Sequence, residues 1–249
     1  MISQGTSSGG TMDDHITHDE NKTMIQRIFG IFLTPRATFS ALAQSIGVLD
    51  LLVPFLILLV LSVGSQRLVG PLTLEEQEQW ILQREDIPDE QKDAILERME
   101  GALSKPSRYL LGGVTLIVWY AILGGVIMFF GAFILSGQAT YRETLAVVLY
   151  ASLVGVVEWV VKIPLILQTG TTKVETGLAL LLPGSLNGTL IYRFFHRLDF
   201  FAMWKVFLVA LGVALVYKVE EKKARMVLFG AWVLAMFLLA WLWGGRGLS

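Results

Sequence analysis

Residues 110–135 read LLGGVTLIVWYAILGGVIMFFGAFIL and contain no charged side chain. A helix that crosses the hydrocarbon core of a bilayer needs about 20 mostly apolar residues. Lipid cannot hydrogen-bond an exposed backbone, and a helix satisfies its backbone internally. This stretch is therefore predicted to be a membrane-spanning helix, and it places the chain among integral membrane proteins.

The composition of the whole chain agrees with that prediction. Of the 249 residues, 54% are hydrophobic and 16% are charged, and the mean hydropathy is +0.60. The net charge of −1 provides no basic surface for nucleic acid, so nucleic-acid binding is not expected. The absence of cysteine excludes disulfides, thiolate nucleophiles and zinc–thiolate sites.

Four more apolar stretches predict spans at about 46–66, 144–168, 200–217 and 226–245. The stretch 200–217 is the shortest, and its one charge, Lys205, is expected to extend toward the headgroups. Residues 176–192 are also uncharged, but Pro183 and Gly184 interrupt them, so no span is predicted there. The predicted fold is an all-α integral membrane protein, with a five-span bundle over residues 46–249.

Three segments outside these spans have a different character. Residues 1–22 are rich in Gly, Ser, Thr and Asp and predict a disordered polar tail. Residues 23–45 mix apolar and polar positions around Pro35 and predict an interfacial amphipathic segment. Residues 72–107 are polar and predict a water-exposed helical hairpin, with one helix starting at a Thr73–Glu76 capping box and the second after Pro88.

The orientation in the membrane should follow the distribution of Lys and Arg. With five spans, eight of these residues fall on the N-terminal side and ten on the other, so the totals do not decide it. The densest cluster, Lys218, Lys222, Lys223 and Arg225, favours the cytoplasm for its own side. The N-terminus lies on that side in a five-span arrangement.

Several short motifs resemble the Yip (Ypt-interacting protein) family in its bacterial branch. The segment Thr34 to Phe39, with Pro35 and Phe39, is similar to the entry segment of that family. Residues 141–145 resemble the start of its third span, and residues 198–204, with Asp199, Phe201 and Trp204, resemble the approach to its fourth. Lys222 to Arg225 then leads into the last span. The order and spacing of these motifs carry the resemblance.

The resemblance implies five spans and a cytoplasmic N-terminus, in the cytoplasmic (inner) membrane of a bacterium. Eukaryotic relatives act in vesicle trafficking with small GTPases, and some bacterial relatives accompany ABC transporters. Nothing in this sequence selects a GTPase as a partner.

The sequence contains no recognisable catalytic set. The spans lack paired aspartates and a His–Glu metal site, and the chain has no phosphate-binding Gly-x-x-x-x-Gly-Lys loop. The Asp and His residues of positions 13–20 belong to the predicted tail, where a rigid metal site is not expected. We therefore expect neither enzymatic activity, nor a cofactor, nor a bound metal.

Two features inside the spans invite a functional interpretation. Glu158 and Lys162 are four residues apart on one helix face and are predicted to pair inside the bundle; alternatively, Lys162 reaches the interface and Glu158 is protonated. Small residues let helices approach closely, so a glycine set is predicted to mark helix-packing positions, within the chain or against a partner. This set is Gly112, Gly113, Gly124, Gly125 and Gly131.

These observations favour a non-enzymatic scaffold or accessory subunit that binds other membrane proteins, an ABC transporter among them. The alternative is a small transporter or channel subunit that uses Glu158 and Lys162 along a polar path. The sequence leaves the partner, any solute and the oligomeric state open.

Overall fold

The computed structural model describes residues 23–104, 107–174 and 176–242, and its regular elements there are all helices. This confirms the predicted all-α fold class. The predicted tail at 1–22 and the last residues of the span predicted to end at 245 lie outside the described residues.

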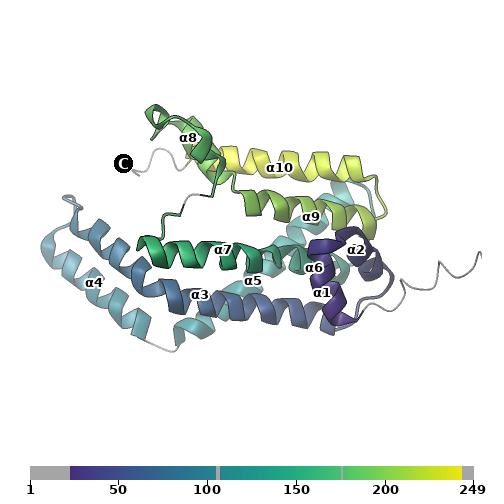
Figure 1. The fold of residues 1–249 in the computed structure, drawn as a ribbon, viewed down its shortest axis with the longest axis horizontal. Coiled ribbons are helices and arrows are strands. Elements are labelled where there is room, and N and C mark those ends of the chain that lie inside the picture. The colour runs from purple at the N-terminus through teal and green to yellow at the C-terminus, as the bar shows by residue number, and fades with distance from the viewer. Residues whose placement is uncertain (1–22, 105–106, 175, 243–249) are drawn as a thin grey trace, which may run out of the picture.

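Four helical stretches in the described residues are long and apolar enough to cross a membrane. They are α3 (Leu49–Leu82); α5 (Ser107–Phe129) with the π-helical turn η1 (Phe130–Ile134); α6 (Tyr141–Ser152) with α7 (Val154–Thr169); and α10 (Glu221–Leu242). A fifth apolar helix, α9 (Phe200–Val216), has 17 residues and extends about 25 Å, at the short limit for a span. α9 runs alongside α10 in Figure 1.

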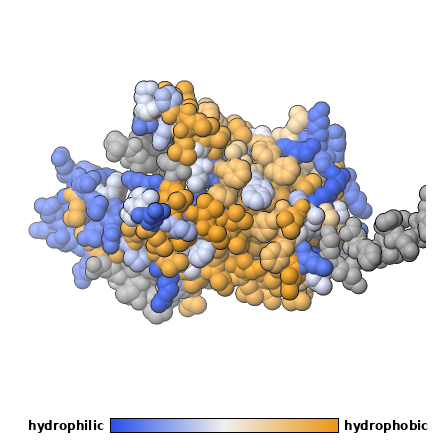
Figure 2. All heavy atoms as spheres, viewed as in Figure 1, coloured by the Kyte–Doolittle hydropathy of each residue, from blue (hydrophilic) through white to orange (hydrophobic). Residues whose placement is uncertain are grey.

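The surface of the molecule separates into three zones (Figure 2). An apolar band covers the middle of the helices, and hydrophilic residues gather at both ends. One hydrophilic end contains α4 (Asp89–Ser104) and the end of α3; the other contains the start of α10. This pattern is typical of a bundle whose middle faces lipid.

The core forms around α9. Leu208, Leu211 and Val213 on this helix are buried, and α2 (Pro35–Gln44), α6 and α10 pack against it. Gly212 permits the closest approach, because a Cβ atom there would lie 2.5 Å from the Val147 side chain and 2.9 Å from Phe39. The shortest of the five predicted spans therefore packs inside the bundle.

Residues 23–45 form two helices, α1 (Met24–Leu33) and α2. A capping box between Thr23 and Gln26 starts α1, and Pro35 occupies the first turn of α2, where a missing N–H is tolerated. α2 buries Phe39 and Leu42 in the core. α1 leaves an exposed apolar stripe of Ile25, Phe29 and Leu33, so the predicted amphipathic pattern lies on α1.

The polar segment after the first span differs from the sequence prediction in one respect. α3 continues without a break from Leu49 to Leu82, so no helix starts at Thr73, and that part of the prediction is wrong. The Thr73 hydroxyl instead donates to the Val69 carbonyl, 3.0 Å away, one turn earlier. A second helix does follow Pro88: α4 packs back along the end of α3, and the two form a hairpin (Figure 1).

Residues 177–199 leave the bundle and return to it at the same place. Gly177 and Asp199 form an isolated β-bridge, and the Leu178 amide donates to the Leu198 carbonyl across 3.1 Å. The chain between them forms the short turns η2 (Leu178–Leu181) and η3 (Gly184–Leu186) and then α8 (Leu190–Arg197). Because its two ends touch, this segment does not carry the chain across the bundle.

Candidate functional site

Glu158 and Lys162 lie on the same face of α7 and form an ion pair. Lys162 Nζ lies 2.8 Å from Glu158 Oε1, and each side chain is 24% exposed. The i, i+4 spacing accounts for this contact, since residues four apart meet on a helix surface. The structure thus places both charges together and largely out of solvent.

Two further charges join this pair from another part of the chain. Lys205 Nζ on α9 lies 2.6 Å from Glu158 Oε2, and Asp199 Oδ2, just before α9, lies 3.0 Å from Lys162 Nζ. The resulting charged chain runs Asp199, Lys162, Glu158, Lys205, with alternating signs. Each internal member contacts two opposite charges, so the set compensates itself where lipid would penalise a lone charge.

Asp199 has a second role as the N-cap of α9. Its Oδ1 accepts hydrogen bonds from the backbone amides of Phe201, at 2.7 Å, and Ala202, at 3.2 Å. Its Oδ2 also accepts from the Thr176 hydroxyl. Asp199 therefore fixes the start of α9, anchors the preceding loop and holds Lys162 at the same time.

The sequence interpretation missed this wider set. From the sequence, Lys205 is expected to extend toward the headgroups; in the structure its ammonium group also lies 2.6 Å from Glu158 Oε2, an ion pair that the sequence did not predict. Asp199 was singled out only as a motif residue. An aspartate directly before an apolar helix is a recognisable N-cap, but its contact with Lys162 depends on how α7 and α9 pack.

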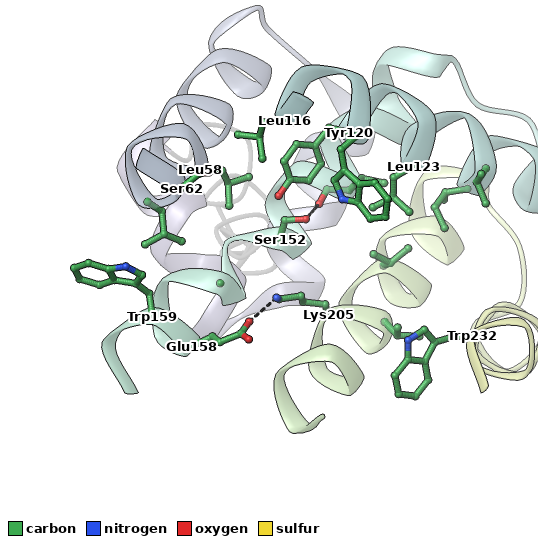
Figure 3. Close-up of a pocket in the computed structure, with 18 of the residues that line it drawn as sticks. Leu58, Ser62, Leu116, Tyr120, Leu123, Ser152, Glu158, Trp159, Lys205 and Trp232 are labelled. Atoms are coloured by element: carbon green, nitrogen blue, oxygen red, sulfur yellow. Dashed lines mark hydrogen bonds and ion pairs between the residues drawn. The ribbon is translucent and has the colours of Figure 1, made fainter. Parts of the chain in front are cut away.

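The charged chain borders a cavity of about 990 Å³ between α3, α5, α6, α7, α9 and α10. Figure 3 shows Glu158 and Lys205 joined on one side, with Leu58, Leu116 and Leu123 elsewhere in the lining. Glu158, Lys162 and Lys205 are the charged residues of its wall, and most of the remaining lining is apolar. The hydroxyl-bearing Ser62, Ser65, Tyr120 and Ser152 also face it.

A second buried polar cluster lies at the other end of the bundle. Asp50 is 4% exposed and accepts from Arg27 Nη1 at 2.9 Å, from the Tyr150 hydroxyl at 3.1 Å and from the Gly47 amide at 2.8 Å. These contacts tie α1 and α6 to the first turn of α3. The cluster therefore joins three helices that are far apart in the sequence.

The predicted glycine set divides into packed and open positions. An added Cβ would lie 2.5 Å from the Tyr217 ring at Gly131, 3.3 Å from Tyr141 at Gly124 and 3.0 Å from Gln66 at Gly112. At Gly113 the nearest atom is a Leu59 methyl at 3.5 Å. Gly125 has no such neighbour within 4 Å. Packing inside the chain thus constrains Gly131 most strongly and Gly125 not at all.

Five of the motif residues lie on α2 and α9, or at the N-cap of α9, and these two helices pack against each other. Pro35 begins α2 and Phe39 is fully buried beneath it. Phe201 is 7% exposed, and the Lys162 ammonium lies 5.8 Å from the centre of its ring. Trp204 packs edge-on against Phe32. These motifs therefore shape the bundle and the support of the charged chain.

Comparison with known proteins gives one match. The family model described as the Yip1 domain matches residues 29–242 of this chain. Searches of curated proteins and of solved structures each found no match. The matched range includes every residue of the charged chain and of the cavity wall.

Proposed function

Because this chain belongs to the Yip1 domain family, we propose that it is a five-span, non-enzymatic membrane protein that serves as a scaffold or accessory subunit for other membrane proteins. Four long apolar helices and the apolar band support its place in the bilayer. The fifth span is α9, whose 17 residues run beside α10.

The observation that carries this proposal is the projecting hairpin. α3 has 34 residues and is therefore about 51 Å long, whereas the hydrocarbon core of a bilayer is about 30 Å thick. Its last turns and α4 extend beyond the apolar band, and α4 packs mainly on α3 (Figure 1). From Glu75 to Glu100 the hairpin has ten acids and three bases, a net charge of −7. Such an arm can reach a partner outside the membrane.

The proposed orientation puts the N-terminus and the Lys218–Arg225 cluster in the cytoplasm of a bacterium and the hairpin outside the inner membrane. The positive cluster and the acidic hairpin lie at opposite ends of the apolar band. Positive charge is retained on the cytoplasmic side, and acidic segments avoid the anionic inner leaflet, so the two features support one orientation.

Site-specific photo-crosslinking in native membranes tests the partner proposal. A photoreactive amino acid is placed at Glu90 or at Glu97 on α4. Both positions should crosslink to one and the same partner membrane protein, for which we propose an ABC transporter. The matched position is exposed Glu220 at the opposite end, which should give no such adduct. Adducts at Glu220 alone, or none at the hairpin, would contradict the proposal.

A second candidate function is favoured by the cavity. Glu158, Lys162 and Lys205 line it, as a polar path for a small solute would require. Purified protein reconstituted alone into vesicles separates the two functions. Solute flux that Glu158→Gln abolishes would favour a transporter, whereas partner binding without flux favours the scaffold.

A further inference from the structure

The lining of the cavity is amphipathic. Its charged side chains come from α7 and α9, while α3, α5 and α10 contribute mostly apolar side chains and a few hydroxyls. Figure 3 shows Glu158 and Lys205 on one side, away from Leu116 and Leu123. A molecule that matches this wall must have a polar group at one end and a hydrocarbon body.

More ammonium groups than carboxylates face the cavity. Lys162 and Lys205 line the cavity, with Glu158 as the acid between them. Asp199, which completes the compensation, is not part of the lining and is already engaged by Thr176 and the α9 amides. The set of four charges is neutral as a whole, but its cavity-facing members are two ammonium groups and one carboxylate, so an anionic ligand group would meet mainly hydrogen-bond donors there.

The two ammonium groups also retain donor capacity. Each Lys ammonium has three N–H donors. Lys205 Nζ donates to Glu158 Oε2, and Lys162 Nζ donates to Glu158 Oε1 and to Asp199 Oδ2. Within the part of the chain that the structure describes, these contacts leave donors for the oxygens of a ligand.

The charged side chains lie together on one side of the cavity. Glu158 and Lys162 on α7 meet Lys205 on α9, five residues beyond the start of that helix at Phe200. The apolar lining from α3, α5 and α10 makes up most of the remaining wall. A phospholipid likewise joins a charged headgroup to hydrocarbon chains.

The cavity has the size of a ligand pocket. At about 990 Å³ it is at the upper end of the size of small-molecule pockets. Its mostly apolar lining suits flexible hydrocarbon chains.

We propose that this cavity binds one membrane phospholipid, whose phosphate accepts hydrogen bonds from Lys205 and Lys162 and whose acyl chains lie between α3, α5 and α10. The site is separate from the projecting hairpin. If the lipid proposal fails, the partner proposal is therefore unaffected, and the reverse also holds.

Native mass spectrometry tests the proposal on the full chain. The protein is reconstituted into bilayers of phosphatidylglycerol and phosphatidylethanolamine, extracted in mild detergent and washed, and the bound lipid is counted and identified. We expect one phospholipid per chain. Ala231→Trp, which fills the cavity from α10, should lower that occupancy at least tenfold; Leu234→Trp, three residues on and exposed outside the lining, should not.

A second pair of variants addresses the headgroup. Lys205→Met should weaken phospholipid binding about tenfold, because it removes a charge-assisted hydrogen bond, whereas Lys222→Met at the opposite end should leave it unchanged. If Lys205→Met fails to fold, Ala231→Trp still tests the lipid proposal, because that variant leaves the ion pairs intact. The proposal is overturned if the wild type retains no phospholipid, if Ala231→Trp retains as much as Leu234→Trp, or if a fatty acid or a protein segment takes the place of the phospholipid.

Discussion

The ammonium group of Lys162 lies 3.0 Å from the carboxylate of Asp199, whose other oxygen caps α9. This contact fastens α7 to the start of α9 across 37 residues of sequence. It also means that Lys162 keeps an acidic partner when Glu158 is removed. Among the described residues, Glu158 is the ion-pair partner of Lys205, so loss of Glu158 should affect Lys205 more than Lys162.

Glu158→Gln should therefore destabilise the protein, mainly because Lys205 loses its ion-pair partner. We expect a loss of about 1–2 kcal/mol, because the side chains are partly exposed and polar contacts between spans are modest in strength. Adding Lys205→Met should recover much of the loss, and adding Lys162→Met should recover less. Thermal unfolding in detergent measures all three variants.

The double-mutant comparison has an internal control, since both rescues remove one lysine from the same ion-pair chain. Additive losses in both double variants would show that the charges do not support one another. Equal rescue by both would show that Asp199 does not hold Lys162 in the membrane.

The sequence was sufficient for contacts that follow from helical spacing and insufficient for those that follow from packing. The pairing of Glu158 with Lys162 could be anticipated from four residues of separation. Lys205 is 47 residues from Glu158, and its contact requires the relative placement of α7 and α9. No local pattern encodes that placement.

The enclosed position of α9 also could not be predicted from the sequence. In lipid, a buried span and an exposed span are both apolar, so hydropathy does not tell them apart. Its burial arises from small residues such as Gly212, which lets Phe39 and Val147 approach. The cavity was unpredictable for the same reason, because it is the space left between six packed helices.

The topology can be tested with single cysteines, because the natural sequence contains none. A cysteine at Glu90 on α4 should react with an impermeant thiol reagent applied to intact cells, and one at Lys222 should not. Both positions are exposed at opposite ends of the apolar band, so permeabilised cells should label both. The reverse pattern would invert the orientation. Labelling of both in intact cells would contradict the odd number of crossings between them.

Two glycines in the same apolar stretch should respond oppositely to alanine. Gly131→Ala places a Cβ 2.5 Å from the ring of Tyr217, which is 2% exposed and whose hydroxyl lies 2.5 Å from the Thr144 hydroxyl. We expect a loss of about 1–3 kcal/mol from overpacking. Gly125→Ala meets no neighbour and should be neutral or slightly stabilising, since alanine favours helix. Thermal unfolding of both compares them, and equal losses would mean that Gly125 is packed against a partner.

The attachment of the hairpin to the bundle should depend on Glu76, near the end of α3. Its Oε1 accepts from the Thr171 hydroxyl and from the Thr172 amide, each at 2.7 Å, and its Oε2 accepts from the Thr172 hydroxyl. These three bonds join the hairpin to the loop after α7.

Glu76→Ala removes all of them, whereas Glu75→Ala makes the same change of charge and size at an exposed neighbour. A charge-assisted hydrogen bond is worth about 1.5–3 kcal/mol, so local opening at residues 171–174 should become roughly 10- to 100-fold more frequent in Glu76→Ala. Hydrogen exchange of that loop measures the effect, and equal protection in the two variants would show that Glu76 does not hold the hairpin in place.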